Sequence, residues 1–279
     1  MEFGGYRCDA VEMCDFLLDG GAMFGMVPKP LWEKKIPADE KNRIPLKSRS
    51  LLLQGHGRRI LIDTGCGTKF SEKELAIYGV TATRSPDEAL ADFGLATDDI
   101  TDVILTHLHF DHAGGNTFRH GDAALPTFAN ATYHTQEKQL SWAKNPTMRD
   151  RASFFPDDWE PMEKTGRLNV VQGDNLPLPN ISLLFSDGHT FGQQLPLIGD
   201  DKGKLLYCGD LIPTSAHLPI PWHMGYDNQP LVIMEEKNRV LAQAMAENWT
   251  LFFEHDPKMA AATIEKKGRY ASVKKEISL

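Results

Sequence analysis

The stretch THLHFDHAGG, residues 106–115, places three histidines and an aspartate within the six positions from His107 to His112. A buried core does not tolerate so many polar side chains without partners, and a surface loop does not need them. Imidazole and carboxylate groups are the donors that Zn²⁺ and other first-row divalent ions accept. The stretch therefore predicts a metal site, in which the binding of ions offsets the free-energy cost of bringing these polar groups together.

Short apolar runs recur along the chain, and each is followed closely by a metal-competent residue or by Asp63. The runs are rich in β-branched or aromatic residues and are bounded by Gly, Pro or Asp, which is typical of buried strands. We expect strands within 58–67, 102–112, 181–190, 204–213 and 249–257. Because ligands at several strand ends can converge, we expect the polar residues to meet on one rim of a sheet.

Helices are expected between these strands. In SPDEALADFGL, Ser85 is a candidate N-cap, Glu88 is its capping-box partner and Gly94 is a plausible stop signal. Further helices are predicted over 136–144, 230–248 and 257–268. Interleaved strands and helices, with no linker or short-period repeat, predict an α/β fold in a single domain over residues 1–279.

Seven polar residues at the ends of the predicted strands form one candidate constellation. They are His107, His109, Asp111, His112, His189, Asp210 and His255. Seven protein ligands are too many for one tetrahedral ion but suit two ions that share a bridge. Two ions about 3.5–4 Å apart can hold a hydroxide between them and clamp both attacking and leaving oxygens.

The segment HLHFDH resembles the HxHxDH motif of the metallo-β-lactamase superfamily, and His189, Asp210 and His255 follow in the order that this superfamily uses. Within the superfamily, GGAMFGMVPKPLWEK and GDLIPTSAHLPIPWHMGYD look like the quorum-quenching N-acyl homoserine lactonases and the related organophosphate hydrolases. The resemblance implies an αββα sandwich, in which two mixed β-sheets are flanked by helices.

The resemblance also implies two divalent ions per chain, which we expect to be zinc, with iron, manganese or cobalt as alternatives. The ligands of the first ion would be His107, His109 and His189. Those of the second would be Asp111, His112 and His255. Asp210 would bridge the two ions, and Asp63 would orient the ligands by hydrogen bonds from behind.

The implied activity is hydrolysis of a lactone or carboxylic ester by a hydroxide that bridges the metals, because bound water loses its proton near pH 7. Asp111 and Asp210 are the candidate catalytic residues, with Asp111 passing a proton to the leaving group. Pro213 stands where these lactonases have a tyrosine three residues after the bridging aspartate. That departure keeps a phosphotriesterase open as the alternative. A glyoxalase II-like thioesterase and an iron redox enzyme are less favoured, because the regions those proteins append are not found here.

Two apolar stretches are expected to line the substrate pocket. The candidate substrate-binding residues are Met23, Phe24, Trp222, His223 and Tyr226. Exposed apolar loops also serve as subunit contacts, so a homodimer is predicted.

Composition limits the partners. The net charge of −8 argues against nucleic-acid binding, which needs a basic face. No apolar run approaches the ~18 residues that a membrane span requires. The first residues lack a leader pattern and the four cysteines form no CxxC pair, so a reduced, cytoplasmic setting is expected.

Overall fold

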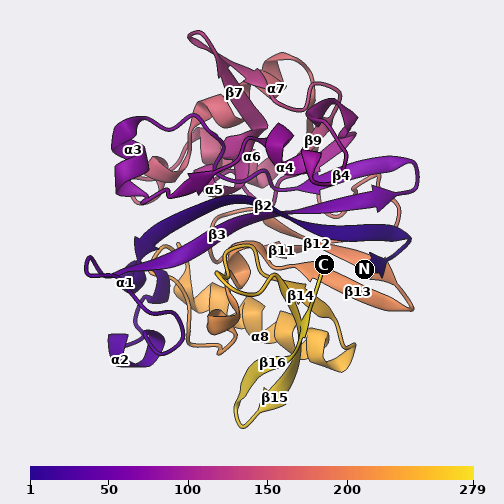
Figure 1. Ribbon diagram of the computed structural model, residues 1–279. Helices are drawn as coiled ribbons and strands as arrows, with labels where there is room; N and C mark the ends of the chain where they lie inside the picture. Colours follow the sequence, from indigo (N-terminus) through magenta and orange to yellow (C-terminus); the bar gives the residue numbers. More distant parts are fainter.

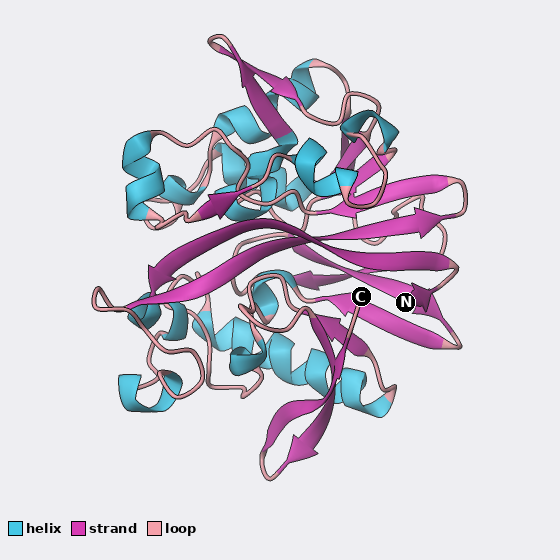
Figure 2. Cartoon of the chain, viewed as in Figure 1, coloured by secondary structure: helices cyan, strands magenta, loops and turns pink.

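The computed structural model describes residues 1–279 as four layers. Two β-sheets pack against each other in the middle, and helices cover the outer face of each sheet (Figures 1 and 2). This arrangement is the αββα sandwich that the resemblance implied. No helix is long and apolar enough to cross a membrane.

The first sheet has eight strands in the order β1-β2-β3-β4-β6-β9-β10, with β5 paired to β2. Strands β4, β6, β9 and β10 run parallel to one another, whereas β2 and β3 form a long antiparallel pair. The bounds are β1 Glu2–Phe3, β2 Tyr6–Asp19, β3 Arg43–Gly55, β4 Arg58–Ile62, β5 Ala82–Thr83, β6 Asp102–Ile104, β9 Thr132–Gln136 and β10 Leu168–Val171.

The second sheet has six strands in sequence order, and its strands β13 and β14 are parallel. The bounds are β11 Ile181–Ser186, β12 Gln193–Asp200, β13 Gly203–Tyr207, β14 Thr250–Phe252, β15 Ala261–Lys267 and β16 Tyr270–Ile277. A separate hairpin is formed by β7 Thr117–His120 and β8 Ala123–Pro126.

Eight α-helices connect or cover these strands, and α8 packs on the second sheet (Figure 1). The bounds are α1 Gly20–Phe24, α2 Lys29–Trp32, α3 Glu72–Ile77, α4 Pro86–Ala91, α5 Phe110–Ala113, α6 Glu137–Lys144, α7 Glu160–Lys164 and α8 Pro230–Ala246. The predicted capping box at the start of α4 is present, because Ser85 and Glu88 bond reciprocally.

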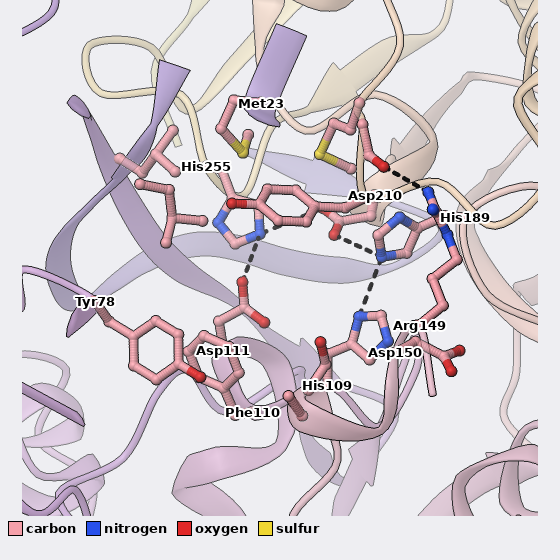
Figure 3. Close-up of a pocket in the computed structure, with 17 residues that line it drawn as sticks. Met23, Tyr78, His109, Phe110, Asp111, Arg149, Asp150, His189, Asp210 and His255 are labelled. Carbon is pink, nitrogen blue, oxygen red and sulfur yellow. Dashed lines mark hydrogen bonds and ion pairs between the residues drawn. The ribbon is translucent and has the colours of Figure 1, made fainter. Parts of the chain in front are cut away.

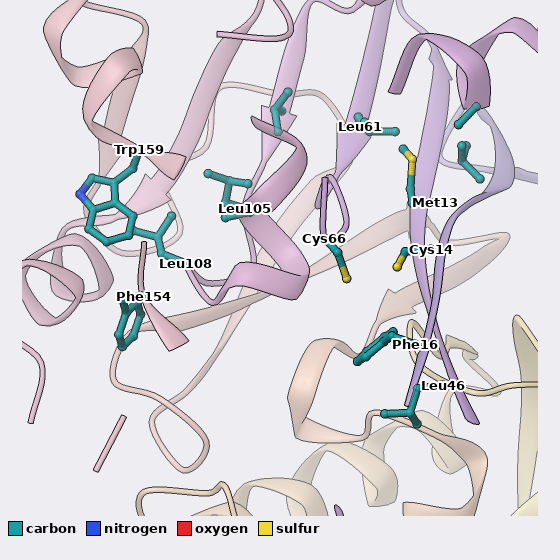
Figure 4. Close-up of a cluster of buried hydrophobic side chains, with 14 of the residues drawn as sticks. Met13, Cys14, Phe16, Leu46, Leu61, Cys66, Leu105, Leu108, Phe154 and Trp159 are labelled. Atoms are coloured by element: carbon teal, nitrogen blue, oxygen red, sulfur yellow. The ribbon is translucent and has the colours of Figure 1, made fainter. Parts of the chain in front are cut away.

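Side-chain alternation along the inner strands of the first sheet divides the core in two. In β4, Ile60 and Ile62 face the second sheet, whereas Leu61 joins the cluster beneath the outer helices. Figure 4 shows that outer cluster, with Leu61, Leu105 and Trp159 among its members. The pleat thus fixes which face each strand presents, and a register slip of one residue would exchange the side chains that the two faces bury.

The helix predicted over residues 257–268 is wrong. Residues 261–267 form β15, which pairs with β14 on one side and β16 on the other. Ala261 and Ile264 are buried in this sheet, and Gly268 turns the hairpin with a φ of +63°. Tertiary strand pairing therefore overrides the helical propensity of the Ala-rich and Lys-rich segment.

Candidate metal centre

The seven candidate ligands come together at the end of the sandwich where the strands of both sheets terminate. His107, His109, Asp111 and His112 follow β6 of the first sheet. His189, Asp210 and His255 follow β11, β13 and β14 of the second sheet. The expectation of one rim of one sheet is therefore corrected: the first sheet contributes four of the seven residues and the second contributes three.

One group of donor atoms contains His107, His109, His189 and Asp210, all within 4.8 Å of one another. His109 Nδ1 lies 3.0 Å from His107 Nε2 and 3.1 Å from His189 Nε2. Asp210 Oδ2 lies 3.0 Å from His189 Nε2. Three imidazole nitrogens and a carboxylate oxygen thus face a common centre.

The second group contains Asp111, His112 and His255. His112 Nε2 and His255 Nε2 are 3.1 Å apart, and Asp111 Oδ2 is 3.7 Å from His255 Nε2. Asp210 reaches this group with its other oxygen, because its Oδ1 lies 3.3 Å from His255 Nε2. Asp210 Oδ2 also lies 3.6 Å from His112 Nε2, so the Asp210 carboxylate contacts both groups.

Hydrogen bonds on the outer side of the rings orient three of these imidazoles. His189 Nδ1 lies 2.9 Å from Asp227 Oδ1, and His255 Nδ1 lies 2.8 Å from the carbonyl oxygen of Lys47 on β3. His112 Nδ1 hydrogen-bonds Asp63 Oδ2 at 3.0 Å and also faces the Glu254 carboxylate, 2.9 Å from its Oε2. These acceptors place the ring proton on Nδ1, so the Nε2 lone pair of each ring points into the site.

Asp63 connects the turn after β4 to the ligand loop. Its Oδ1 accepts from the Thr106 amide at 2.7 Å, and its Oδ2 accepts from the Thr106 hydroxyl at 2.6 Å. That hydroxyl lies 3.0 Å from His107 Nδ1, and Asp63 Oδ2 also lies 3.0 Å from His112 Nδ1. Asp63 holds a φ of +54°, a costly conformation for a residue other than glycine, and this places its carboxylate behind both rings.

The glycines of HAGG allow the ligand loop to lie directly on the turn that follows Asp63. A Cβ atom at Gly114 or Gly115 would overlap the carbonyl oxygens of Cys66 and Thr64. The Thr64 amide also donates to the His112 carbonyl oxygen at 2.7 Å. The close approach fixes the position of His112 relative to Asp63, which is the reason this loop needs small residues.

The donor set fits divalent cations. Bare nitrogen lone pairs that face each other at 3.0–3.1 Å repel unless a cation or a proton lies between them. His109 Nε2 and Asp210 Oδ1 are buried and have no hydrogen-bond partner. Nitrogen and carboxylate donors without thiolate are typical of catalytic zinc and related ions.

A metal requires neutral imidazole rings and an ionised carboxylate, and the surroundings favour these states for His107, His109 and Asp210. Burial and the neighbouring imidazoles lower the pKa of His107 and His109 well below the usual range, so both rings are neutral at pH 7. Burial would lower the pKa of His189 as well, but the adjacent carboxylates of Asp210 and Asp227 raise it to about 9. Burial opposes ionisation of Asp210, yet the nearby histidines hold its pKa well below the usual range.

A cavity of about 310 Å³ opens beside the metal centre (Figure 3). Its polar floor includes His109, Asp111, His189, Asp210 and His255. The remaining wall is largely apolar or aromatic and contains Leu18, Met23, Leu46, Tyr78, Phe110, Met224 and Tyr226. Tyr78 stacks on Phe110 with ring centroids 4.3 Å apart. A small cavity with an apolar wall and a few convergent polar groups is the usual form of a small-molecule site.

Of the five residues predicted to bind substrate, Met23 and Tyr226 line this cavity, and the other three lie behind its wall. Phe24 is fully buried and stacks on His217, with ring centroids 4.6 Å apart. Trp222 packs edge-on against Phe24, and His223 bonds the Met224 carbonyl oxygen. Phe24 therefore belongs to the same buried apolar cluster as Met23, and Trp222 packs against that cluster, whereas His223 is held by the backbone beside Met224.

Sequence reasoning missed several residues of this site. Asp227 and Glu254 orient ligand histidines, and Tyr78, Phe110 and Arg149 line the cavity. Glu254 left a signal, since it directly precedes His255 in FFEHDP. Phe110 also left one, since it lies within HLHFDH between His109 and Asp111. Asp227, Tyr78 and Arg149 left none, because only folding brings the loops that carry them to the ligands.

Comparison with known proteins identifies the family. The model of the metallo-beta-lactamase superfamily matches residues 43–255, which span all seven candidate ligands. The chain belongs to this superfamily. With the fold and the gathered donor set described above, the chain is a metallo-hydrolase of this superfamily.

The superfamily relatives include lactonases. The N-acyl homoserine lactonase AiiA of Bacillus thuringiensis subsp. kurstaki is 27% identical over 220 residues, which cover 74% of this chain and 79% of the relative. A probable metal-dependent hydrolase from Staphylococcus aureus has a TM-score of 0.92 at 30% identity and covers 100% of this chain and 99% of its own. The dizinc quorum-quenching lactonase AidC has a TM-score of 0.84 at 19% identity and covers 100% and 97%, a likeness of fold alone.

Proposed function

We propose that this metallo-hydrolase opens lactones or cleaves related carboxylic esters, with N-acyl homoserine lactones as the substrate type to test first. The observation that carries the proposal is the small, partly apolar cavity that ends on Asp111, Asp210 and the ligand histidines. Such a cavity holds an acyl chain against its wall and presents a carbonyl to the polar floor. The lactonase relatives support the same substrate class.

His107, His109 and His189 would hold one divalent ion, and Asp111, His112 and His255 would hold another. Asp210, whose carboxylate contacts both groups, would be shared by the two ions. When bound, the ions would supply Lewis acidity toward the carbonyl and a more acidic water. Asp111 would take the proton that the attacking water loses and return it to the leaving alkoxide oxygen as the acyl C–O bond breaks. Its side chain is suited to this because it lines the cavity and its Oδ2 lies 3.7 Å from His255 Nε2.

Tyr226 would supply the phenol that position 213 lacks. Pro213 does not line the cavity; its carbonyl oxygen accepts from the His255 amide at 3.0 Å and so supports the ligand strand. Tyr226 lines the cavity, and burial together with nearby carboxylates raises its pKa to about 12. The phenol therefore stays protonated at pH 7 and can donate a hydrogen bond to a substrate carbonyl oxygen.

The test is hydrolysis of N-acyl homoserine lactones of several chain lengths by zinc-loaded protein, followed by acid release. We expect turnover that requires the metal and is lost in D111N, while Y226F retains the metal and raises KM. Paraoxon is assayed in parallel, because Pro213 keeps a phosphotriester substrate open. Faster turnover of paraoxon than of every lactone would refute the proposal in favour of a phosphotriesterase, and absence of lactone turnover by fully loaded protein would refute it outright.

A further inference from the structure

The wall of the cavity contains a single side chain with a permanent positive charge, Arg149. The other lining residues are apolar, neutral or acidic, or are histidines of the metal centre. Figure 3 shows Arg149 beside His189, on the opposite side of the cavity from Tyr78. The guanidinium therefore shares one cavity with the apolar wall and the metal centre.

No carboxylate of the protein neutralises this charge. Arg149 forms no ion pair, although its neighbour Asp150 is buried beside it. The Asp150 carboxylate accepts instead from Trp142 Nε1 at 2.7 Å and Asn228 Nδ2 at 2.9 Å. Asp227 is likewise engaged, since its oxygens bond His189 and the Met224 amide. The carboxylates of Asp150, next to Arg149 in the chain, and of Asp227, whose carbonyl oxygen Arg149 bonds, are therefore occupied elsewhere.

The guanidinium is held by one of its nitrogens only. Arg149 Nη2 donates to the carbonyl oxygens of Gly225, at 2.6 Å, and Asp227, at 2.8 Å. These two bonds use both hydrogens of Nη2. The N–H groups of Nε and Nη1 have no acceptor in the protein, so the other edges of the planar group stay available to a ligand.

The segment that carries Arg149 is fixed by its own contacts. Asp150 Oδ1 accepts from the Thr147 amide at 3.0 Å and from the Thr147 hydroxyl at 2.8 Å, which closes a tight turn. The bond from Asn228 to Asp150 ties this turn to the loop next to His189. Arg149 is thus presented by a pre-organised turn, which reduces the ordering cost of binding a ligand.

We propose that Arg149 binds a carboxylate on the substrate, so that the preferred substrates are esters or lactones that carry a second, anionic group. The proposal rests on the hydrolase function proposed above and names its substrate class. A guanidinium edge matches the planar carboxylate with two parallel hydrogen bonds, whereas a neutral tail leaves its charge unmatched. The apolar wall would cover the methylene chain between the ester carbonyl and that carboxylate.

The test compares two esters of equal length, mono-p-nitrophenyl glutarate and p-nitrophenyl valerate, with zinc-loaded wild type, R149M and R149K. R151M is the matched control, because Arg151 is an exposed arginine of the same segment that does not line the cavity. We expect wild type to prefer the glutarate ester. R149M should lower kcat/KM for that ester about tenfold or more, mainly through KM, and change the valerate ester less than about twofold. R149K should recover part of the loss, and R151M should match wild type.

Binding of glutarate to the metal-free protein, measured by calorimetry, separates this inference from the proposed function. If neither ester nor any lactone is turned over, the hydrolase proposal fails, and Arg149-dependent glutarate binding still supports the anion site. Equal losses for both esters in R149M would show that Arg149 only ties two loops together, which overturns the inference. Glutarate binding that is absent in wild type, or unchanged in R149M, overturns it as well.

Discussion

Replacing Asp227 with asparagine tests how far the outer hydrogen bonds hold the metal centre together. Asp227 Oδ1 lies 2.9 Å from His189 Nδ1, and Oδ2 accepts from the Met224 amide at 2.8 Å. Asparagine has one acceptor oxygen, so one of these two hydrogen bonds is lost, and the acceptor of the remaining bond is no longer charged. Loss of such an outer partner weakens metal binding by about 10–100-fold, which corresponds to about 1.4–2.8 kcal/mol. We expect D227N near the lower value and D227A near the upper one.

Zinc affinity is measured at pH 7 by competition with a chromophoric chelator. The control is D102N, because Asp102 is also a buried carboxylate that pairs with a histidine, 3.0 Å from His134 Nε2, yet touches no candidate ligand. D102N should lower the free energy of unfolding and leave zinc affinity within about twofold of wild type. The reasoning is refuted if D227N binds zinc as tightly as wild type, or if D102N weakens zinc binding to the same degree.

Three further predictions follow from the same geometry. D210A should lose bound zinc, measured by elemental analysis, together with hydrolysis, and full activity in that variant would contradict a position between the two ions. G67A should unfold at a lower temperature than G94A, because both glycines have positive φ but only a Cβ at Gly67 overlaps the Gly114 carbonyl group; equal melting temperatures would contradict the steric argument. Burial lowers the pKa of His217 from 6.5 to about 4, so its share of the stability is complete above pH 6.5 and is lost as the pH falls toward 4. That share is about 3 kcal/mol. In urea unfolding of metal-free protein, the free energy of unfolding of H217Q should therefore depend less steeply on pH than that of wild type. An unchanged pH dependence in H217Q would exclude His217 as its source.

Local patterns in the sequence were enough for an interleaved α/β fold and for the residues that could bind metal, whereas the αββα sandwich followed from the family resemblance. The side chains of a strand such as β4 alternate between two apolar surroundings, and a ligand loop such as HLHFDH concentrates donors within a few positions. Both patterns can be recognised within a short window of residues. The helix predicted over 257–268 failed because the same window can pair as a strand when β14 and β16 lie beside it. Propensity is a weak term compared with the burial and hydrogen bonds that such pairing supplies.

Tertiary structure alone decided which groups surround the metal ligands and the cavity. Asp227 and Glu254 reach His189 and His112 through contacts that span up to 142 residues of chain, and no spacing rule anticipates them. Arg149 likewise becomes part of the cavity only because its turn is tied to the loop after Met224. Sequence by itself determined the kind of chemistry, since donor types are properties of residues. The packing of two sheets determined where those donors point and what a substrate would meet beside them, since those are properties of contacts between distant segments.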